Sequence, residues 1–314
     1  MQPKIVVLGT GGTIAGTAAS ATDALGYTAA QLGVAQLVAA VPALVQVPLE
    51  CEQVAQLDSK DMDHATLQRL AVRCAHHLAR ADVVGLVVTH GTDTLEETAY
   101  FLHRVLAPAK PLVLTAAMRP ATSLQADGPQ NLLDAVTLVR AGGARGVCAV
   151  LAGGVFHPVG LRKSHSHRLE AFDGGDAGPL ARIEQGRLRR FRDWPQGDAL
   201  GLAAVAREPH AWPRVEIVLN HAGAGGRIVD ALLAQGLDGL VVAGTGNGTL
   251  SAALAAALRR AAQAGVCVLR ASRCASGPVI AVPGEEFRAA GDGLSAVQAR
   301  VELLLQLLTA RLAP

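Results

Sequence analysis

Short β-branched apolar runs alternate along the first half of the chain with longer segments, rich in alanine and leucine, that have helical spacing. The apolar runs predict strands at residues 5–8, 83–88, 112–114 and 147–151. The segments between them predict helices at residues 65–80, 94–106 and 130–140. Alternation of this kind is typical of a parallel sheet that helices cover. We therefore expect an α/β fold, with a layered and mostly parallel sheet and helices on both faces.

Two aspartates stand where predicted helices begin. Asp63 precedes the helix at 65–80, and Asp127 precedes the helix at 130–140. An aspartate side chain at this position commonly accepts a hydrogen bond from a free backbone N–H group of the first turn. Pro129 also suits an early helical position, where its missing N–H group costs nothing.

The alternation breaks after residue 151, where glycine, proline, arginine and histidine become frequent. Short alternating pieces at 181–191 predict a β-hairpin. Alternation then resumes, with predicted strands at 215–219, 237–243 and 266–269 and predicted helices at 229–234, 251–264 and 295–311. We expect an N-terminal domain over 1–191, a linker over 192–213 and a smaller C-terminal α/β domain over 214–314.

Composition and charge narrow the function classes. Half of the 314 residues are hydrophobic, which is ample for two cores. The net charge is +2 without a basic block, so we expect no nucleic-acid partner. No apolar run reaches the roughly 18 residues of a membrane span, so we expect no membrane attachment. The N-terminus lacks a signal-peptide pattern and the five cysteines lack CxxC spacing, which favours the cytoplasm.

A glycine-rich turn, GTGGT at residues 9–13, follows the first predicted strand. Glycine lets backbone N–H groups approach a ligand closely. A dinucleotide site would require a third glycine where Ile14 stands, and a P-loop would require a Gly-Lys-Ser/Thr sequence that is missing. Two interpretations remain: the turn presents the Thr13 hydroxyl for chemistry, or Thr13 caps a short helix.

A second turn of the same kind, HGTDT at residues 90–94, follows the strand at 83–88. Thr92 or Asp93 could cap the next helix with Glu96 as a partner, or could serve a site. Ser59 follows a further extended run and offers a hydroxyl to a carboxylate, or belongs to a plain turn. The carboxyl ends of parallel strands meet at one edge of a sheet, so Thr13 and Thr92 could converge on one small molecule. Either hydroxyl needs an activating partner to become a nucleophile.

Residues 9–16 (GTGGTIAG) and 89–100 (THGTDTLEETAY) resemble the two signatures of bacterial-type L-asparaginases. Residues 116–120 (AAMRP), 126–132 (ADGPQNL) and 243–248 (AGTGNG) are also similar to this family. The resemblance implies an amidohydrolase that converts L-asparagine to L-aspartate and ammonia through a threonine nucleophile. A broader glutaminase-asparaginase, a non-catalytic amino-acid binder and an amidotransferase subunit stay open as alternatives.

The resemblance also implies roles for individual residues. Thr13 is the expected nucleophile, Tyr27 on a mobile loop is its partner, and Lys163 polarises Thr92 beside Asp93. Ser59 and backbone amides would hold the substrate carboxylate, Asp93 the ammonium group, and the Ala117 carbonyl the leaving amide. The full set of expected substrate-binding residues is Ser59, Lys60, Thr92, Asp93, Gly12, Gly91, Ala117 and Asn247.

Assembly and departures from the family pattern follow from the same resemblance. It implies a homotetramer of intimate dimers, in which the C-terminal domain, through Asn247, completes a neighbouring subunit's site. Many members have glutamine where this chain has Lys60, which cannot accept a hydrogen bond. The glutamate that the family takes from a second subunit has no clear counterpart, although Glu285 and Glu286 lie close to its place. We expect no cofactor and no metal.

Overall fold

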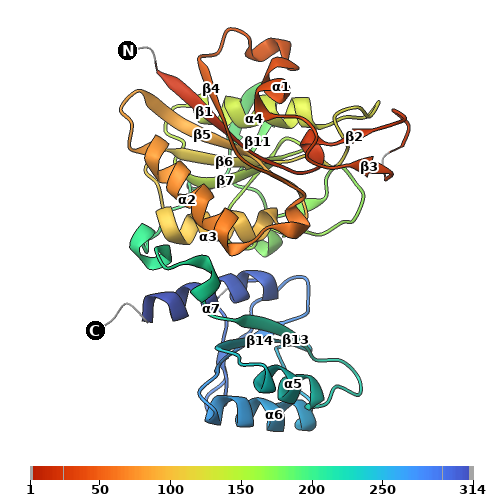
Figure 1. The fold of residues 1–314 in the computed structure, drawn as a ribbon, viewed down its shortest axis with the longest axis vertical. Coiled ribbons are helices and arrows are strands. Elements are labelled where there is room, and N and C mark those ends of the chain that lie inside the picture. The colour runs from red at the N-terminus through yellow and green to blue at the C-terminus, as the bar shows by residue number, and fades with distance from the viewer. Residues whose placement is uncertain (1–2, 24, 292, 311–314) are drawn as a thin grey trace. The chain divides into compact units, whose positions relative to one another are not determined.

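The computed structural model describes residues 3–23, 25–291 and 293–310. The chain divides into two compact units, the first ending at Leu202 and the second beginning at Ala203 (Figure 1). This division lies within the segment 192–213 that the sequence suggests as a linker.

An eight-stranded sheet forms the centre of the first unit. Its strands are β1 (Lys4–Gly11), β4 (Leu49–Leu57), β5 (Val83–Thr89), β6 (Pro111–Thr115), β7 (Gly146–Leu151), β8 (Gly154–Phe156), β11 (Ala181–Glu184) and β12 (Arg187–Arg190). They lie in the order β12-β11-β8-β7-β6-β5-β1-β4. The five strands from β7 to β4 are parallel, and the other three continue the sheet antiparallel. The predicted fold class is confirmed.

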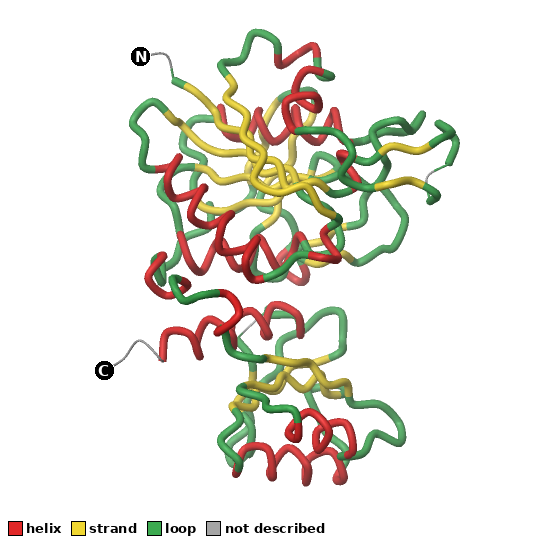
Figure 2. The backbone as a smooth tube through the Cα atoms, viewed as in Figure 1, coloured by secondary structure: helices red, strands yellow, loops and turns green. Residues whose placement is uncertain are grey.

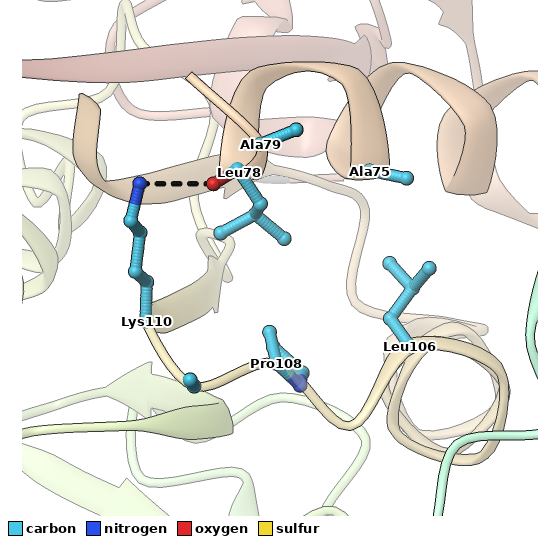
Figure 3. A pocket seen from close by; sticks show the side chains of 7 residues that line it. Ala75, Leu78, Ala79, Leu106, Pro108 and Lys110 are labelled. Carbon is cyan, nitrogen blue, oxygen red and sulfur yellow. Dashed lines mark hydrogen bonds between the residues drawn. The ribbon is translucent and has the colours of Figure 1, made fainter. Parts of the chain in front are cut away.

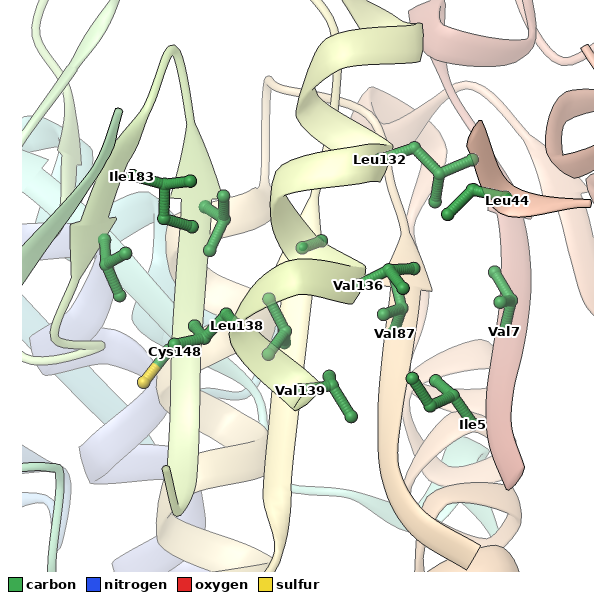
Figure 4. Close-up of a cluster of buried hydrophobic side chains, with 14 of the residues drawn as sticks. Ile5, Val7, Leu44, Val87, Leu132, Val136, Leu138, Val139, Cys148 and Ile183 are labelled. Carbon is green, nitrogen blue, oxygen red and sulfur yellow. The ribbon is translucent and has the colours of Figure 1, made fainter. Parts of the chain in front are cut away.

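Helices cover both faces of this sheet (Figures 1 and 2). Helices α1 (Val34–Ala39) and α4 (Gly128–Arg140) lie on one face, and α2 (His64–Leu78) and α3 (Leu95–Leu106) lie on the other. Under α4, Val136 and Leu132 pack with strand residues such as Val7 and Val87 in one buried cluster (Figure 4). Because both faces are covered, the central strands are apolar at nearly every position.

The two aspartates that precede helices behave differently. The Asp63 carboxylate accepts the Thr66 N–H group at 2.7 Å and caps α2, as predicted. Asp127 stands at the N-cap position of α4, but its side chain makes no cap bond, so this prediction is wrong. Its carboxylate instead accepts the N–H groups of Met118 and Arg119, at 3.0 and 2.9 Å, and so fixes the loop after β6.

The second unit has its own parallel sheet, in the order β13-β14-β15-β16. Its strands are β13 (Val215–Leu219), β14 (Gly239–Gly244), β15 (Cys267–Ser272) and β16 (Arg288–Ala289), and its helices are α5 (Arg227–Ala234), α6 (Ala252–Gln263) and α7 (Ala296–Ala310). The predicted end of the last helix, residue 311, lies outside the described residues. Among the described residues, no helix is long and apolar enough to cross a membrane.

Two small antiparallel ribbons lie outside the large sheet, and the hydrophobic pattern predicted neither. One pairs β2 (Thr17–Ala18) with β3 (Tyr27–Thr28), and the other pairs β9 (Arg162–Lys163) with β10 (Phe172–Asp173). Strands of two residues are too short to show a period. These ribbons carry Tyr27 and Lys163, two of the expected site residues.

Candidate active site

The two threonine turns lie against each other at the carboxyl ends of the neighbouring strands β1 and β5. Gly12 has a φ of 81°, in the left-handed region that favours glycine, and its N–H group donates to the Leu57 carbonyl at 2.9 Å. A Cβ atom on Gly12 would overlap the backbone of Gly91. Thr10 Oγ1 also donates to the Thr89 carbonyl at 3.0 Å. The glycines therefore permit a contact between the turns that any side chain would prevent.

Thr13 begins a short 3-10 helix, Thr13–Ala15, directly after the first turn. Its Oγ1 lies 2.7 Å from the Tyr27 hydroxyl oxygen, and either group can be the donor. The β2–β3 ribbon that carries Tyr27 is tied to a neighbouring loop, because the Ala18 N–H group donates to Thr122 Oγ1 at 2.8 Å. The structure thus brings together the expected nucleophile and its expected partner from opposite ends of a loop.

A second polar cluster forms where β5 leads into α3. Lys163 Nζ donates to Thr92 Oγ1 at 2.9 Å and to Asp93 Oδ1 at 2.6 Å. An ammonium group can only donate, so Thr92 Oγ1 accepts and its own proton points elsewhere. Lys163 is the more buried member of the ion pair, and the Asp93 side chain keeps 52% of its surface exposed. The arrangement polarises one hydroxyl and leaves the Asp93 carboxylate, which Lys163 binds from one side, half exposed to a second cation.

Ser59 joins the loop after β4 to this cluster. Its side chain is buried, and its Oγ accepts the Asp93 N–H group at 3.2 Å. Its carbonyl accepts the Thr94 hydroxyl at 2.8 Å. A Cβ atom on Gly91 would overlap Ser59 Oγ, so this turn also needs glycine. Three loops, which follow β1, β4 and β5, therefore meet at one edge of the sheet.

Lys60, beside Ser59, points to its acidic neighbours. Its Nζ lies 2.6 Å from Asp58 Oδ2 and 3.4 Å from Asp61 Oδ2. The hydrogen bond to Asp58 raises the pKa of the Lys60 ammonium group, against a smaller opposing effect of burial. Lys60 therefore carries a positive charge next to the serine loop, although its side chain is 62% exposed.

The remaining expected residues lie in two places. Ala117 is buried just beyond β6, the strand beside β5. Asn247 belongs to the second unit, where its side-chain amide binds the backbone of Ile280. Asn247 Nδ2 donates to the Ile280 carbonyl at 2.9 Å, and Asn247 Oδ1 accepts the Ile280 N–H group at 2.7 Å. In the same unit Glu285 is paired with Arg270, and Glu286 with Arg259.

Two supporting residues were not predicted. His90 is buried, and its Nδ1 lies 2.7 Å from the Gly91 carbonyl, which can only accept, so Nδ1 carries the proton. Nε2 then accepts from the Thr98 hydroxyl at 3.0 Å. Burial lowers the pKa of His90 to about 4. This neutral imidazole holds the backbone of the second turn.

Glu96 is the second supporting residue, and the sequence suggested it only as a capping partner. That interpretation is wrong, because helix α3 has its N-cap at Thr94 and Glu96 Oε2 accepts the Lys163 N–H group at 2.9 Å. The two residues are 67 positions apart, so no local pattern could have revealed the contact.

A separate hollow of about 310 Å³ lies where α2 and α3 end (Figure 3). Its lining is mostly apolar: Ala75, Leu78, Ala79, Leu106, Pro108, Ala109 and Lys110. The Lys110 ammonium group donates to the Leu78 carbonyl at 2.9 Å and so caps α2. None of the expected site residues lines this hollow. In the described part of the chain, no group of three or more potential metal ligands is placed to hold a metal ion.

Comparisons with known proteins show the family to which the chain belongs. The family model "Asparaginase, N-terminal" matches residues 4–196, and "Glutaminase/Asparaginase C-terminal domain" matches residues 214–311. The chain is 38% identical over 278 residues to L-asparaginase 2 of Escherichia coli K12, which covers 88% of this chain and 79% of that one. It is 36% identical over 277 residues to the glutaminase-asparaginase of Pseudomonas fluorescens biotype A, covering 87% and 76%.

A solved structure is also similar over nearly the full length. The crystal structure of a probable cytoplasmic L-asparaginase from Campylobacter jejuni has a TM-score of 0.91 at 34% identity and covers 98% of this chain and 95% of that one. The resemblance drawn from the threonine turns is thereby confirmed. The chain belongs to the asparaginase family.

Proposed function

We propose that this protein is an L-asparaginase, which hydrolyses L-asparagine to L-aspartate and ammonia with Thr13 as the nucleophile. The observation that carries the proposal is the 2.7 Å contact between the hydroxyl groups of Thr13 and Tyr27, next to a second threonine held by Lys163. A threonine hydroxyl is a weak nucleophile until a neighbouring group accepts its proton. The names of the relatives in both comparisons support the same reaction.

In the first step, Thr13 Oγ1 attacks the side-chain amide carbon of asparagine. Its proton passes by way of the Tyr27 hydroxyl to the amide nitrogen, the C–N bond breaks, and ammonia leaves. An ester then joins Thr13 to the aspartyl group. In the second step, a water molecule adds to this ester, its proton returns to Thr13 Oγ1, and aspartate is released.

Thr92, Asp93 and Lys163 serve the substrate side of the reaction. The Thr92 hydroxyl, polarised by the lysine, orients the reacting acyl group and the water of the second step. Backbone N–H groups around Gly12 and Thr92 stabilise the oxyanion, and one such donor is worth about 10²–10³ in rate. The Ala117 carbonyl receives the leaving amide nitrogen.

The two charges of an α-amino acid account for the other residues. Ser59 and the backbone amides at Gly12 and Gly91 bind the α-carboxylate, and the half-exposed Asp93 carboxylate binds the α-ammonium group. The positive Lys60 stands where it weakens the binding of the substrate ammonium group.

Asn247 reaches the site of a neighbouring subunit in a homotetramer built from intimate dimers, and light scattering of the purified protein tests that assembly.

A broader glutaminase-asparaginase is the second candidate, because a relative of that name is 36% identical to the chain. One methylene group separates the two substrates, and such a difference is worth only about 1–3 kcal/mol in a pocket.

We assign the protein to the cytoplasm, which the name of the Campylobacter jejuni relative supports. A Haemophilus influenzae relative is named a probable periplasmic L-asparaginase.

The experiment that tests the proposal is ammonia release from L-asparagine and L-glutamine by the wild-type protein and by Thr13→Ala. We expect asparagine hydrolysis by the wild type and a loss of about 10³-fold or more in the variant, since nucleophile and base act as a unit. No ammonia from either amide would refute the function. Full activity of Thr13→Ala would refute the nucleophile alone.

A further inference from the structure

Lys163 lies on the β9–β10 ribbon rather than on the large sheet that carries both threonines. In this ribbon Lys163 faces Phe172, and the next residue, Ser164, donates its N–H group to the Ala171 carbonyl at 2.7 Å. Hydrogen-bonded and non-hydrogen-bonded pairs alternate in an antiparallel ribbon. Lys163 therefore occupies a non-hydrogen-bonded position, and its N–H group points out of the ribbon.

The carboxylate of Glu96 meets that N–H group. Glu96 Oε2 accepts it at 2.9 Å, while the ammonium group of the same lysine donates to Thr92 Oγ1 at 2.9 Å and Asp93 Oδ1 at 2.6 Å. Glu96 follows Thr92 by four residues and Asp93 by three. Both ends of Lys163 are thus held by one short segment, residues 92–96, where β5 leads into α3.

Helix capping does not explain this glutamate. The N-cap of α3 is Thr94, so Glu97 stands at the third helical position, where a capping box would have its carboxylate. Glu96 stands one position earlier and turns to the ribbon. Burial raises the pKa of Glu96 to about 7, and the hydrogen bond from the Lys163 N–H group opposes this rise. The charges of Glu97, Arg162 and Asp173 also act on the Glu96 carboxyl group.

We propose that Glu96 is a positioning residue for Lys163: by accepting the lysine's backbone N–H group, it fixes the ribbon so that the ammonium group reaches Thr92 and Asp93. The inference rests on the proposed role of the Thr92–Asp93–Lys163 cluster. Without this acceptor, the Lys163 N–H group would lose its hydrogen bond, since a non-hydrogen-bonded position offers it no partner within the ribbon. A displacement of about 1 Å of a reacting group can cost about 10²-fold in rate.

The test compares steady-state kinetics with L-asparagine for the wild type, Glu96→Ala, Glu96→Gln, Glu97→Ala and Lys163→Met. Glutamine at position 96 keeps an oxygen that accepts the N–H group, and Glu97 is the matched control on the same helical turn. We expect kcat of Glu96→Ala to fall about 10- to 100-fold with a smaller change in KM. Glu96→Gln and Glu97→Ala should stay within about threefold of the wild type, below the smallest loss expected for Glu96→Ala.

Each contrary outcome has a distinct meaning. Loss of activity in Lys163→Met with full kcat in Glu96→Ala would overturn the positioning role and leave the lysine's role intact. Full activity of Lys163→Met would overturn the role of the cluster, and the inference with it. If Glu96→Ala does not fold, Glu96→Asp carries the test, because it keeps the charge but shortens the reach by one methylene group; an unchanged kcat in that variant would count against the proposal.

Discussion

The hydroxyl groups of Thr13 and Tyr27 lie 2.7 Å apart, although one residue begins a short 3-10 helix after β1 and the other belongs to the small β2–β3 ribbon. At this distance one hydroxyl group donates a hydrogen bond to the other. The tyrosine is therefore placed to take a proton from the threonine and to return it.

Replacing Tyr27 by phenylalanine tests this relationship. The ring stays and the hydroxyl is lost, so we expect kcat to fall about 10²–10⁴-fold, the usual contribution of a general acid–base group, with little change in KM. Steady-state ammonia release measures both constants. A variant with full kcat would show that the proton of Thr13 takes another route.

Replacing Lys60 by glutamine should improve the affinity for asparagine. The ammonium group of Lys60 is held by Asp58 and Asp61, 2.6 and 3.4 Å away, close to the loop assigned to the substrate. Glutamine removes a positive charge and can accept a hydrogen bond from the substrate ammonium group. We expect KM to fall about two- to fivefold, because interactions between exposed charges are weak. Lys60→Arg, which keeps the charge, is the control and should leave KM unchanged; a rise in KM of the glutamine variant would contradict the assignment.

Replacing Gly91 by alanine should damage the protein, because the new Cβ atom would overlap Ser59 Oγ. We expect a loss of about 1–3 kcal/mol in the free energy of unfolding, together with lower activity, since overpacking forces neighbouring atoms to shift. Gly142→Ala is the matched control, because nothing lies within 4 Å of a Cβ atom there. Equal stability of the two variants in denaturant titrations would mean that Gly91 and Ser59 are not in tight contact.

Three histidines predict how stability depends on pH. Burial lowers the pKa of His90, His103 and His157 from 6.5 to about 4. Between these values the unfolded chain binds more protons than the folded one, so the contribution of these histidines is present above pH 6.5 and is lost as the pH falls toward 4. Denaturant unfolding at several pH values should show a smaller slope in His157→Asn. An identical slope in the variant would refute the prediction for this residue.

The sequence predicted the large sheet well for a physical reason. Strands β1 and β5 are buried on both faces, so they appear as continuous apolar runs, and the glycine turns after them could be identified from residues 9–13 and 90–94. The convergence of the two turns followed from the parallel sheet. The partners of Thr13 and Thr92 came only from the family resemblance.

The supporting contacts could not be predicted, because they join distant segments through single side chains. Glu96 and Lys163 are 67 residues apart, and Asp127 binds backbone amides of a preceding loop rather than of its own helix. The ribbons that carry Tyr27 and Lys163 have strands of two residues and no periodic pattern. A short sequence window contains none of these relationships.

The most direct test of the nucleophile is to find the covalent ester. The Thr92→Val variant should slow the water step more than the attack by Thr13, so that the aspartyl ester accumulates during turnover of L-asparagine. Samples stopped with acid, digested and mapped by mass spectrometry should carry one aspartyl group on Thr13. An aspartyl group on any other residue would contradict the assignment of Thr13 as the nucleophile.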